Sequence, residues 1–181
     1  MNSMRFAAVL AGLVCVPAIA FAHGASRLKE TESIEINAPA AKVWKVIGNF
    51  HDMSWLPGVV STTGPGENTP NVAKRVITLK GGATVEESLY KYDASEMSYS
   101  YAIDKVDLKV LPVTNYSSTL IVLPDGDKSK VEWRGAFFRG DPNFNPPPNL
   151  SDDAAMKAVG DLYKAGLAGL KKKVESSEAT N

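Results

Sequence analysis

Cysteine and histidine are almost absent from the sequence, and their scarcity limits the chemistry that the chain can carry. One cysteine, Cys15, and two histidines, His23 and His51, occur among 181 residues. A lone thiol cannot form an intramolecular disulfide, and a transition-metal site needs more nitrogen and sulfur ligands than these. An amino-terminal histidine binds copper only with further ligands. We therefore predict no metal site and assign no cofactor.

An excess of charge of one sign is also missing. The formal net charge is +0 at pH 7, and the one notable run of like charge is the lysine triplet at 171–173. Binding to nucleic acid needs a concentrated basic face, so nucleic acid is not an expected partner. The sequence also lacks an HExxH motif, a phosphate-binding glycine loop and a nucleophile elbow, so it supplies no catalytic assignment.

The first 22 residues have the three parts of a secretory signal peptide. Arg5 precedes a nearly uninterrupted apolar stretch over residues 6–19, and Ala20-Phe21-Ala22 supplies small residues at a cleavage site. The apolar stretch is short for a membrane span. We predict cleavage after Ala22, export to the periplasm, and no membrane span in the mature chain. Residues 23–32 are predicted to be a mobile segment, and residues 176–181 a disordered tail.

The middle of the chain alternates apolar and polar residues, as β-strands do. Strands are predicted over residues 33–38, 59–63, 73–80, 84–92, 97–103, 113–123 and 130–139. Two short helices, 40–49 and 50–55, are predicted after the first strand, and the proline-rich loop 141–149 cannot join a sheet.

A long helix is predicted to follow this loop. Ser151 is its expected N-cap, with Asp152 and Asp153 in the first turn. Strands segregated from helices favour an α+β layer fold for residues 33–175, a curved antiparallel sheet closed over the C-terminal helix, with a cavity between them.

Several motifs connect this order of elements to a known family. They are Ala38-Pro39 followed by Trp44, Trp55-Leu56-Pro57, Asn115-Tyr116, Val131-x-Trp133, and the set Arg75, Gly82, Glu87 and Asp93. In these features the chain resembles the START/Bet v 1-like (SRPBCC) superfamily, which implies the helix-grip fold.

Two further stretches are similar to MxaD-type proteins, which are exported SRPBCC proteins. They are the loop from Asp141-Pro142-Asn143 to Pro146-Pro147-Pro148-Asn149, and the segment leading into Val159-Gly160-Asp161-Leu162-Tyr163. This resemblance implies a non-enzymatic accessory of methanol oxidation, with a periplasmic methanol dehydrogenase and its cytochrome c as partners.

Arg75 and Glu87 are the first candidate residues of a binding site. If Lys80-Gly81-Gly82 is a three-residue hairpin loop, Arg75 lies opposite Glu87, whereas a two-residue Gly-Gly turn sets Arg75 opposite Ser88. An inward Arg–Glu pair could orient a polar ligand group. The simpler interpretation, which we favour, is a structural ion pair in the cavity wall.

Three tyrosines, Tyr99, Tyr101 and Tyr116, are predicted to point into the same space, with Ser118 beside them. Each could place one hydroxyl against a ligand or could simply fill the core. Trp55, just before Pro57-Gly58, is a candidate for the cavity mouth.

Three functions fit these features. The first is the periplasmic accessory role, with a small hydrophobic ligand in the cavity as an option. The second is a carrier or sensor of a small hydrophobic molecule or lipid. The third is a polyketide cyclase-like enzyme using Glu87, Arg75 and Tyr116, although the sequence shows no geometry for proton transfer.

Overall fold

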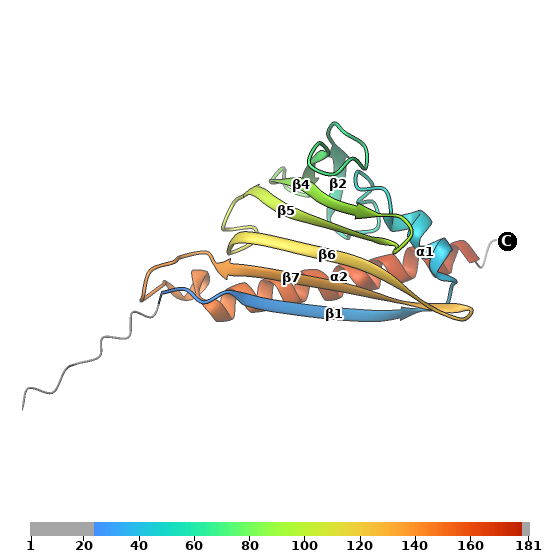
Figure 1. Ribbon diagram of the computed structural model, residues 1–181. Coiled ribbons are helices and arrows are strands. Elements are labelled where there is room, and N and C mark those ends of the chain that lie inside the picture. The colour runs from blue at the N-terminus through green and yellow to red at the C-terminus, as the bar shows by residue number, and fades with distance from the viewer. Residues whose placement is uncertain (1–23, 179–181) are drawn as a thin grey trace, which may run out of the picture.

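A computed structural model describes residues 24–178 and contains a seven-stranded antiparallel sheet with a long helix across one face (Figure 1). The strands lie in the order β1-β7-β6-β5-β4-β3-β2. The elements in chain order are β1 (Leu28–Ile36), α1 (Ala40–Ile47), β2 (Val59–Thr63), β3 (Lys74–Leu79), β4 (Thr84–Asp93), β5 (Ser98–Val106), β6 (Val113–Asp125), β7 (Lys128–Arg139), η1 (Pro148–Leu150) and α2 (Asp152–Glu178).

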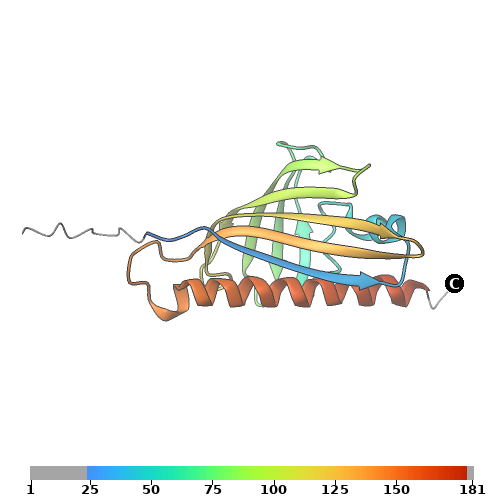
Figure 2. The same cartoon turned by 60° about the horizontal axis from the view of Figure 1, so that its bottom comes forward.

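The sheet curves, and α2 lies along its hollow side. Figure 2 shows α2 running beneath β1 and β7, while the strands of the other half of the sheet rise away from the helix. Every neighbouring pair of strands is antiparallel, and register shifts interrupt the ladders of β2–β3, β4–β5 and β6–β7. Such irregularities increase local twist, which helps the sheet to bend. This is the predicted helix-grip fold.

One side of α2 is buried against the sheet. Its buried side chains recur every three or four residues: Ala155, Val159, Tyr163, Leu167, Leu170 and Val174. As predicted, Ser151 caps the helix, since its Oγ accepts a hydrogen bond from the Ala154 amide at 3.2 Å. In the described part of the chain, no helix is long and apolar enough to cross a membrane.

Two glycines of α2 allow bulky groups to pack close to the helix backbone. A Cβ placed on Gly166 would lie 2.6 Å from the ring of Trp133, and one on Gly169 would lie 2.5 Å from the Trp55 carbonyl oxygen. Gly160, in contrast, has only a Glu30 side-chain carbon nearby, at 3.9 Å. The first two glycines are thus required by packing and the third is not.

The first strand begins earlier than the sequence indicated. Residues 28–32, predicted to be part of a mobile segment, form the start of β1 and pair with β7 from Leu28 opposite Phe137 onward. Glu32 is half-buried and forms an ion pair with Lys164 of α2 at 3.2 Å. The polar composition that suggested mobility belongs to an edge strand beside a charged helix surface.

The second predicted short helix, 50–55, is absent: these residues form turns. The Asn49 side chain accepts a hydrogen bond from the His51 amide at 3.0 Å, and the Asp52 side chain accepts one from the Ser54 amide at 2.9 Å. Such local side-chain bonds compete with helix formation.

At the ends of the chain, α2 continues through Glu178, so residues 176–178 of the predicted tail are helical. The predicted signal peptide, residues 1–22, lies outside the described residues, as do residues 179–181.

Alanine substitutions at two glycines of α2 should have opposite effects on stability. Gly160→Ala should raise the free energy of unfolding by about 0.5–1 kcal/mol, because alanine favours the helix and no atom obstructs its Cβ. Gly166→Ala should lower it by roughly 1–3 kcal/mol, because Trp133 and Leu56 must move. Urea denaturation of both variants measures the difference. Equal effects of the two substitutions would contradict the packing described.

Candidate functional site

The β3–β4 hairpin decides which side chains face the helix. Leu79 and Ala83 are joined by a hydrogen bond from the Leu79 amide to the Ala83 carbonyl at 2.8 Å, so the loop has three residues. Gly81 and Gly82 have φ angles of 95° and 87°, which disfavour any side chain. With this loop, Arg75 pairs directly with Glu87, as one of the two predicted alternatives required.

Arg75 and Glu87 form a buried ion pair, with Arg75 Nε 2.6 Å from Glu87 Oε2. Arg75 Nη1 donates to the Phe50 carbonyl, and the guanidinium lies 4.1 Å from the centroid of the Phe50 ring and 5.0 Å from that of Tyr101. Arg75 is 1% exposed. The Arg75 charge is therefore contacted by the Glu87 carboxylate, the Phe50 carbonyl and the faces of two aromatic rings.

Burial and pairing act in opposite directions on this pair. Desolvation raises the pKa of the Glu87 carboxyl, and the positive charge of Arg75 limits that rise. Desolvation alone would lower the pKa of Arg75, yet Glu87 raises it above its ordinary value. Arg75 thus stays charged, and Glu87 serves as its counter-ion inside the protein.

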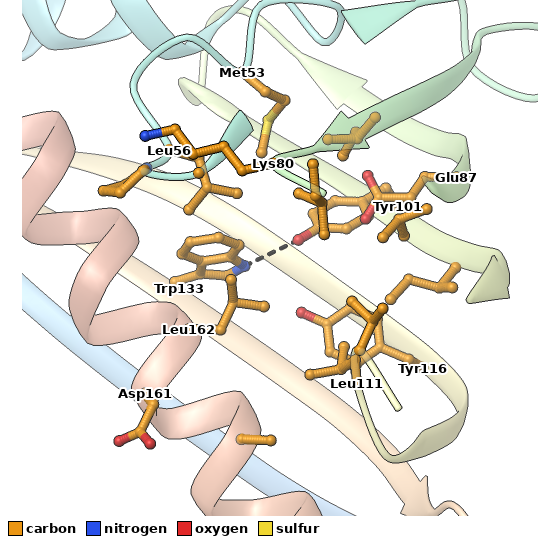
Figure 3. A pocket seen from close by; sticks show the side chains of 18 residues that line it. Met53, Leu56, Lys80, Glu87, Tyr101, Leu111, Tyr116, Trp133, Asp161 and Leu162 are labelled. Atoms are coloured by element: carbon orange, nitrogen blue, oxygen red, sulfur yellow. Dashed lines mark hydrogen bonds between the residues drawn. The ribbon is translucent and has the colours of Figure 1, made fainter. Parts of the chain in front are cut away.

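A cavity of about 500 Å³ lies between the sheet and α2. Figure 3 shows the Glu87 carboxylate, the hydroxyls of Tyr101 and Tyr116, and the Trp133 indole around it, with Leu162 on the α2 side. Most other lining side chains are apolar. Lys80 and Asp161 line it as well but are exposed, so they mark its opening to solvent.

A hydrogen-bond network stands behind the cavity wall. Tyr163 of α2 stacks on Trp133, with ring centroids 4.4 Å apart, and its hydroxyl lies 2.6 Å from that of Tyr116 and 3.1 Å from Ser118 Oγ. Ser118 Oγ donates to the Arg134 carbonyl at 2.7 Å. A Cβ on Gly135 would lie 2.0 Å from the Tyr163 hydroxyl, so glycine is required there.

The tyrosines of this site stay protonated over a wide pH range. Desolvation raises the pKa of both Tyr101 and Tyr116 well above the ordinary value, and it raises that of Tyr163 as well. Trp133 Nε1 donates to the Tyr101 hydroxyl at 3.1 Å. These phenols therefore act as neutral hydrogen-bonding groups and not as bases.

The predicted site residues divide into two groups. Glu87, Tyr101 and Tyr116 line the cavity, whereas Arg75, Tyr99, Ser118 and Trp55 are buried but do not line it. The Tyr99 ring packs against Phe50, with centroids 6.0 Å apart, and its hydroxyl has no partner of good geometry among the described residues.

Trp55 is not at the mouth of the cavity. Its Nε1 donates to the Asp52 carbonyl at 3.0 Å, and its ring meets that of Trp133 edge to face at 5.5 Å. The next three residues, Leu56, Pro57 and Gly58, line the cavity in its place.

The sequence interpretation missed Tyr163 and named Trp133 only within the motif Val131-x-Trp133. A signal for Tyr163 was present, because it lies four residues after Val159 on the buried side of the helix. Within residues 24–178, no three side chains of histidine, cysteine, aspartate or glutamate come together as a metal site would need.

The comparison with known families agrees with this architecture. The sequence profile of the family described as polyketide cyclase / dehydrase and lipid transport matches residues 27–175. The chain belongs to this family. Its predicted place in the START/Bet v 1-like superfamily is thus confirmed, while the similarity to MxaD-type proteins stays a prediction.

Two solved structures share about a third of the sequence. An uncharacterised protein from Bacillus thuringiensis is 31% identical, with a TM-score of 0.68 over 81% of this chain and 98% of the other. XoxI from Bacillus cereus is 30% identical, with a TM-score of 0.69 over 83% and 97%. No curated protein matches the sequence.

A more distant structure shares the fold alone. Norcoclaurine synthase from Thalictrum flavum, in complex with dopamine and hydroxybenzaldehyde, is 15% identical, with a TM-score of 0.62 over 93% of this chain and 98% of the other.

Removing the charge of Glu87 should destabilise the protein strongly. Glu87→Gln leaves the buried Arg75 charge unpaired, and the free energy of unfolding should fall by about 3–5 kcal/mol in urea denaturation. The double variant Arg75→Met with Glu87→Leu should recover most of this loss, because no buried charge remains.

Glu86→Gln, on the same strand, is the matched control. It removes an exposed ion pair with Lys105 and should cost less than about 1 kcal/mol. A loss at Glu87 no larger than that at Glu86 would show that Arg75 does not depend on its counter-ion.

Proposed function

We propose that the protein binds a small, mainly apolar molecule in the cavity between the sheet and α2, and that it does so without transforming it. The observation that supports this proposal most directly is the cavity itself. Its volume of about 500 Å³, its mostly apolar wall and its few polar groups are typical of small-molecule sites.

Two features favour binding over catalysis. The tyrosine hydroxyls have pKa values raised away from neutrality, so they stay neutral and supply neither a phenolate base nor a readily released proton. Glu87 has one oxygen bound to Arg75 Nε, and the positive charge of Arg75 limits the rise in the Glu87 pKa that burial causes, so Glu87 is tied up as a counter-ion.

Filling the cavity should abolish binding. We expect phenylnaphthylamine, a neutral dye that fluoresces in apolar surroundings, to bind the protein, and Ala158→Phe to weaken its binding at least tenfold because Ala158 lines the cavity on α2. Fluorescence titration measures both affinities. Ala165→Phe, on the exposed side of the same helix, should leave binding unchanged. Equal binding by the two variants would place the dye elsewhere.

We also propose the physiological setting of an exported accessory protein of methanol oxidation. The signal-peptide pattern over residues 1–22 and the similarity to MxaD-type proteins support this role, as does the likeness to a protein named XoxI. The partners would be a periplasmic methanol dehydrogenase and its cytochrome c, and the protein would act in the periplasm.

This role predicts a measurable effect on electron transfer. Adding the purified protein to methanol dehydrogenase and cytochrome c should raise the rate of cytochrome reduction, followed by its absorbance. If the rate increase needs a bound ligand, Ala158→Phe should lose it and Ala165→Phe should keep it. If it needs only contact with the partners, both variants should keep it. No change in rate at stoichiometric excess of the protein would refute the accessory role and would leave the cavity proposal standing.

A further inference from the structure

We infer that the cavity selects a neutral ligand that carries a hydrogen-bond acceptor and a hydroxyl donor, such as a hydroxylated aromatic ketone, and that it rejects carboxylates. The inference rests on the proposed binding function and adds a chemical class of ligand. It follows from the direction of the hydrogen bonds around Tyr101, Tyr116 and Glu87, all three of which line the cavity.

The direction of the bonds at Tyr116 is set from behind the wall. The hydrogen of Ser118 Oγ is used on the Arg134 carbonyl, because a carbonyl can only accept. In the contact between Ser118 and Tyr163, the Tyr163 hydroxyl must therefore donate and Ser118 Oγ must accept. Because the Tyr163 hydrogen is used there, Tyr116 must be the donor in its 2.6 Å contact with Tyr163.

Only this orientation satisfies all three contacts together. If Tyr163 donated to Tyr116 instead, the Ser118 and Tyr163 oxygens would face each other at 3.1 Å with no hydrogen between them. Tyr116 therefore turns its hydrogen away from the cavity and offers a ligand only the lone pairs of its oxygen.

Tyr101, in contrast, can donate a hydrogen bond to a ligand. The Trp133 indole can only donate, so the Tyr101 oxygen accepts at 3.1 Å and keeps its own hydrogen. No acceptor for that hydrogen occurs among the hydrogen bonds of residues 24–178. In Figure 3 the Tyr101 hydroxyl points toward Trp133 across the cavity wall, where a ligand oxygen could receive its hydrogen.

Glu87 supplies a further acceptor and disfavours anions. Its Oε2 accepts from Arg75, and the structure gives its other oxygen no hydrogen bond within the described chain. Arg75 does not line the cavity, so its charge is not offered to a ligand. A carboxylate deep inside would meet the Glu87 carboxylate and the lone pairs of Tyr116, with Tyr101 as the donor there, since Lys80, which also lines the cavity, lies at its exposed opening.

Four naphthalene probes that differ in one group test this pattern. They are an acetylnaphthol, the corresponding acetylnaphthalene, an ethylnaphthol and a hydroxynaphthoate, each titrated by displacement of phenylnaphthylamine. The acetylnaphthol should bind roughly 2- to 10-fold more tightly than acetylnaphthalene or ethylnaphthol, which each lack one hydrogen bond. The hydroxynaphthoate should bind at least tenfold more weakly than the acetylnaphthol.

Three tyrosine variants assign each preference to a side chain. Tyr101→Phe should remove the advantage of the acetyl group, and Tyr116→Phe should remove that of the hydroxyl group. Tyr163→Phe, at a positioning residue that does not line the cavity, frees the Tyr116 hydrogen. It should therefore reduce the advantage of the hydroxyl group and increase that of the acetyl group. Tyr90→Phe is the control at an exposed position.

The outcomes separate this inference from the proposed function. If phenylnaphthylamine does not bind, the binding function itself fails. If the dye binds but the four probes displace it equally, or Tyr163→Phe leaves their order unchanged, the inference is overturned and the cavity remains a site without polar selection. Phenylnaphthylamine affinity of each variant shows whether the cavity is intact.

Discussion

The stacking of Tyr163 on Trp133 is the contact on which the rest of the structure depends. It joins the middle of α2 to the centre of β7, with ring centroids 4.4 Å apart, and both sides need glycine, at Gly135 beneath the tyrosine and at Gly166 beside the indole. The same two rings present their polar atoms to Tyr116 and Tyr101. This pair of aromatic side chains therefore links the docking of the helix to the hydrogen bonds of the cavity wall.

Much of the fold could be predicted from the sequence, because alternation and turn residues act locally. The strand order along the chain and the capped C-terminal helix are present, and of the two pairings considered for Arg75 the structure has the one with Glu87. Of the predicted site residues the structure places only Glu87, Tyr101 and Tyr116 at the cavity, since alternation gives the face of a sheet but not the depth of a residue beneath the helix. Tyr99 and Ser118 accordingly lie behind the wall that Tyr101 and Tyr116 form.

The remaining differences come from interactions that a residue pattern does not show. Asn49 and Asp52 replace a predicted helix by side-chain bonds to nearby amides. The start of β1 pairs with β7 and carries Glu32, whose ion-pair partner Lys164 is far away in the chain. Tyr163 was missed because its role arises only when α2 meets β7, although its place on the buried side of the helix was visible.

The three-residue loop Lys80-Gly81-Gly82 has a consequence for how this scaffold can diversify. Successive side chains of a strand point to opposite faces, so deleting one loop residue would turn β4 over and move Glu87 to the outer surface. Exchanging side chains along β4 and β5 changes single positions of the cavity wall, whereas a change of loop length would exchange the inner and outer faces of a whole strand. The length of this loop therefore tolerates less change than the side chains of the strands do. New specificities on this scaffold should come from substitution and not from insertion.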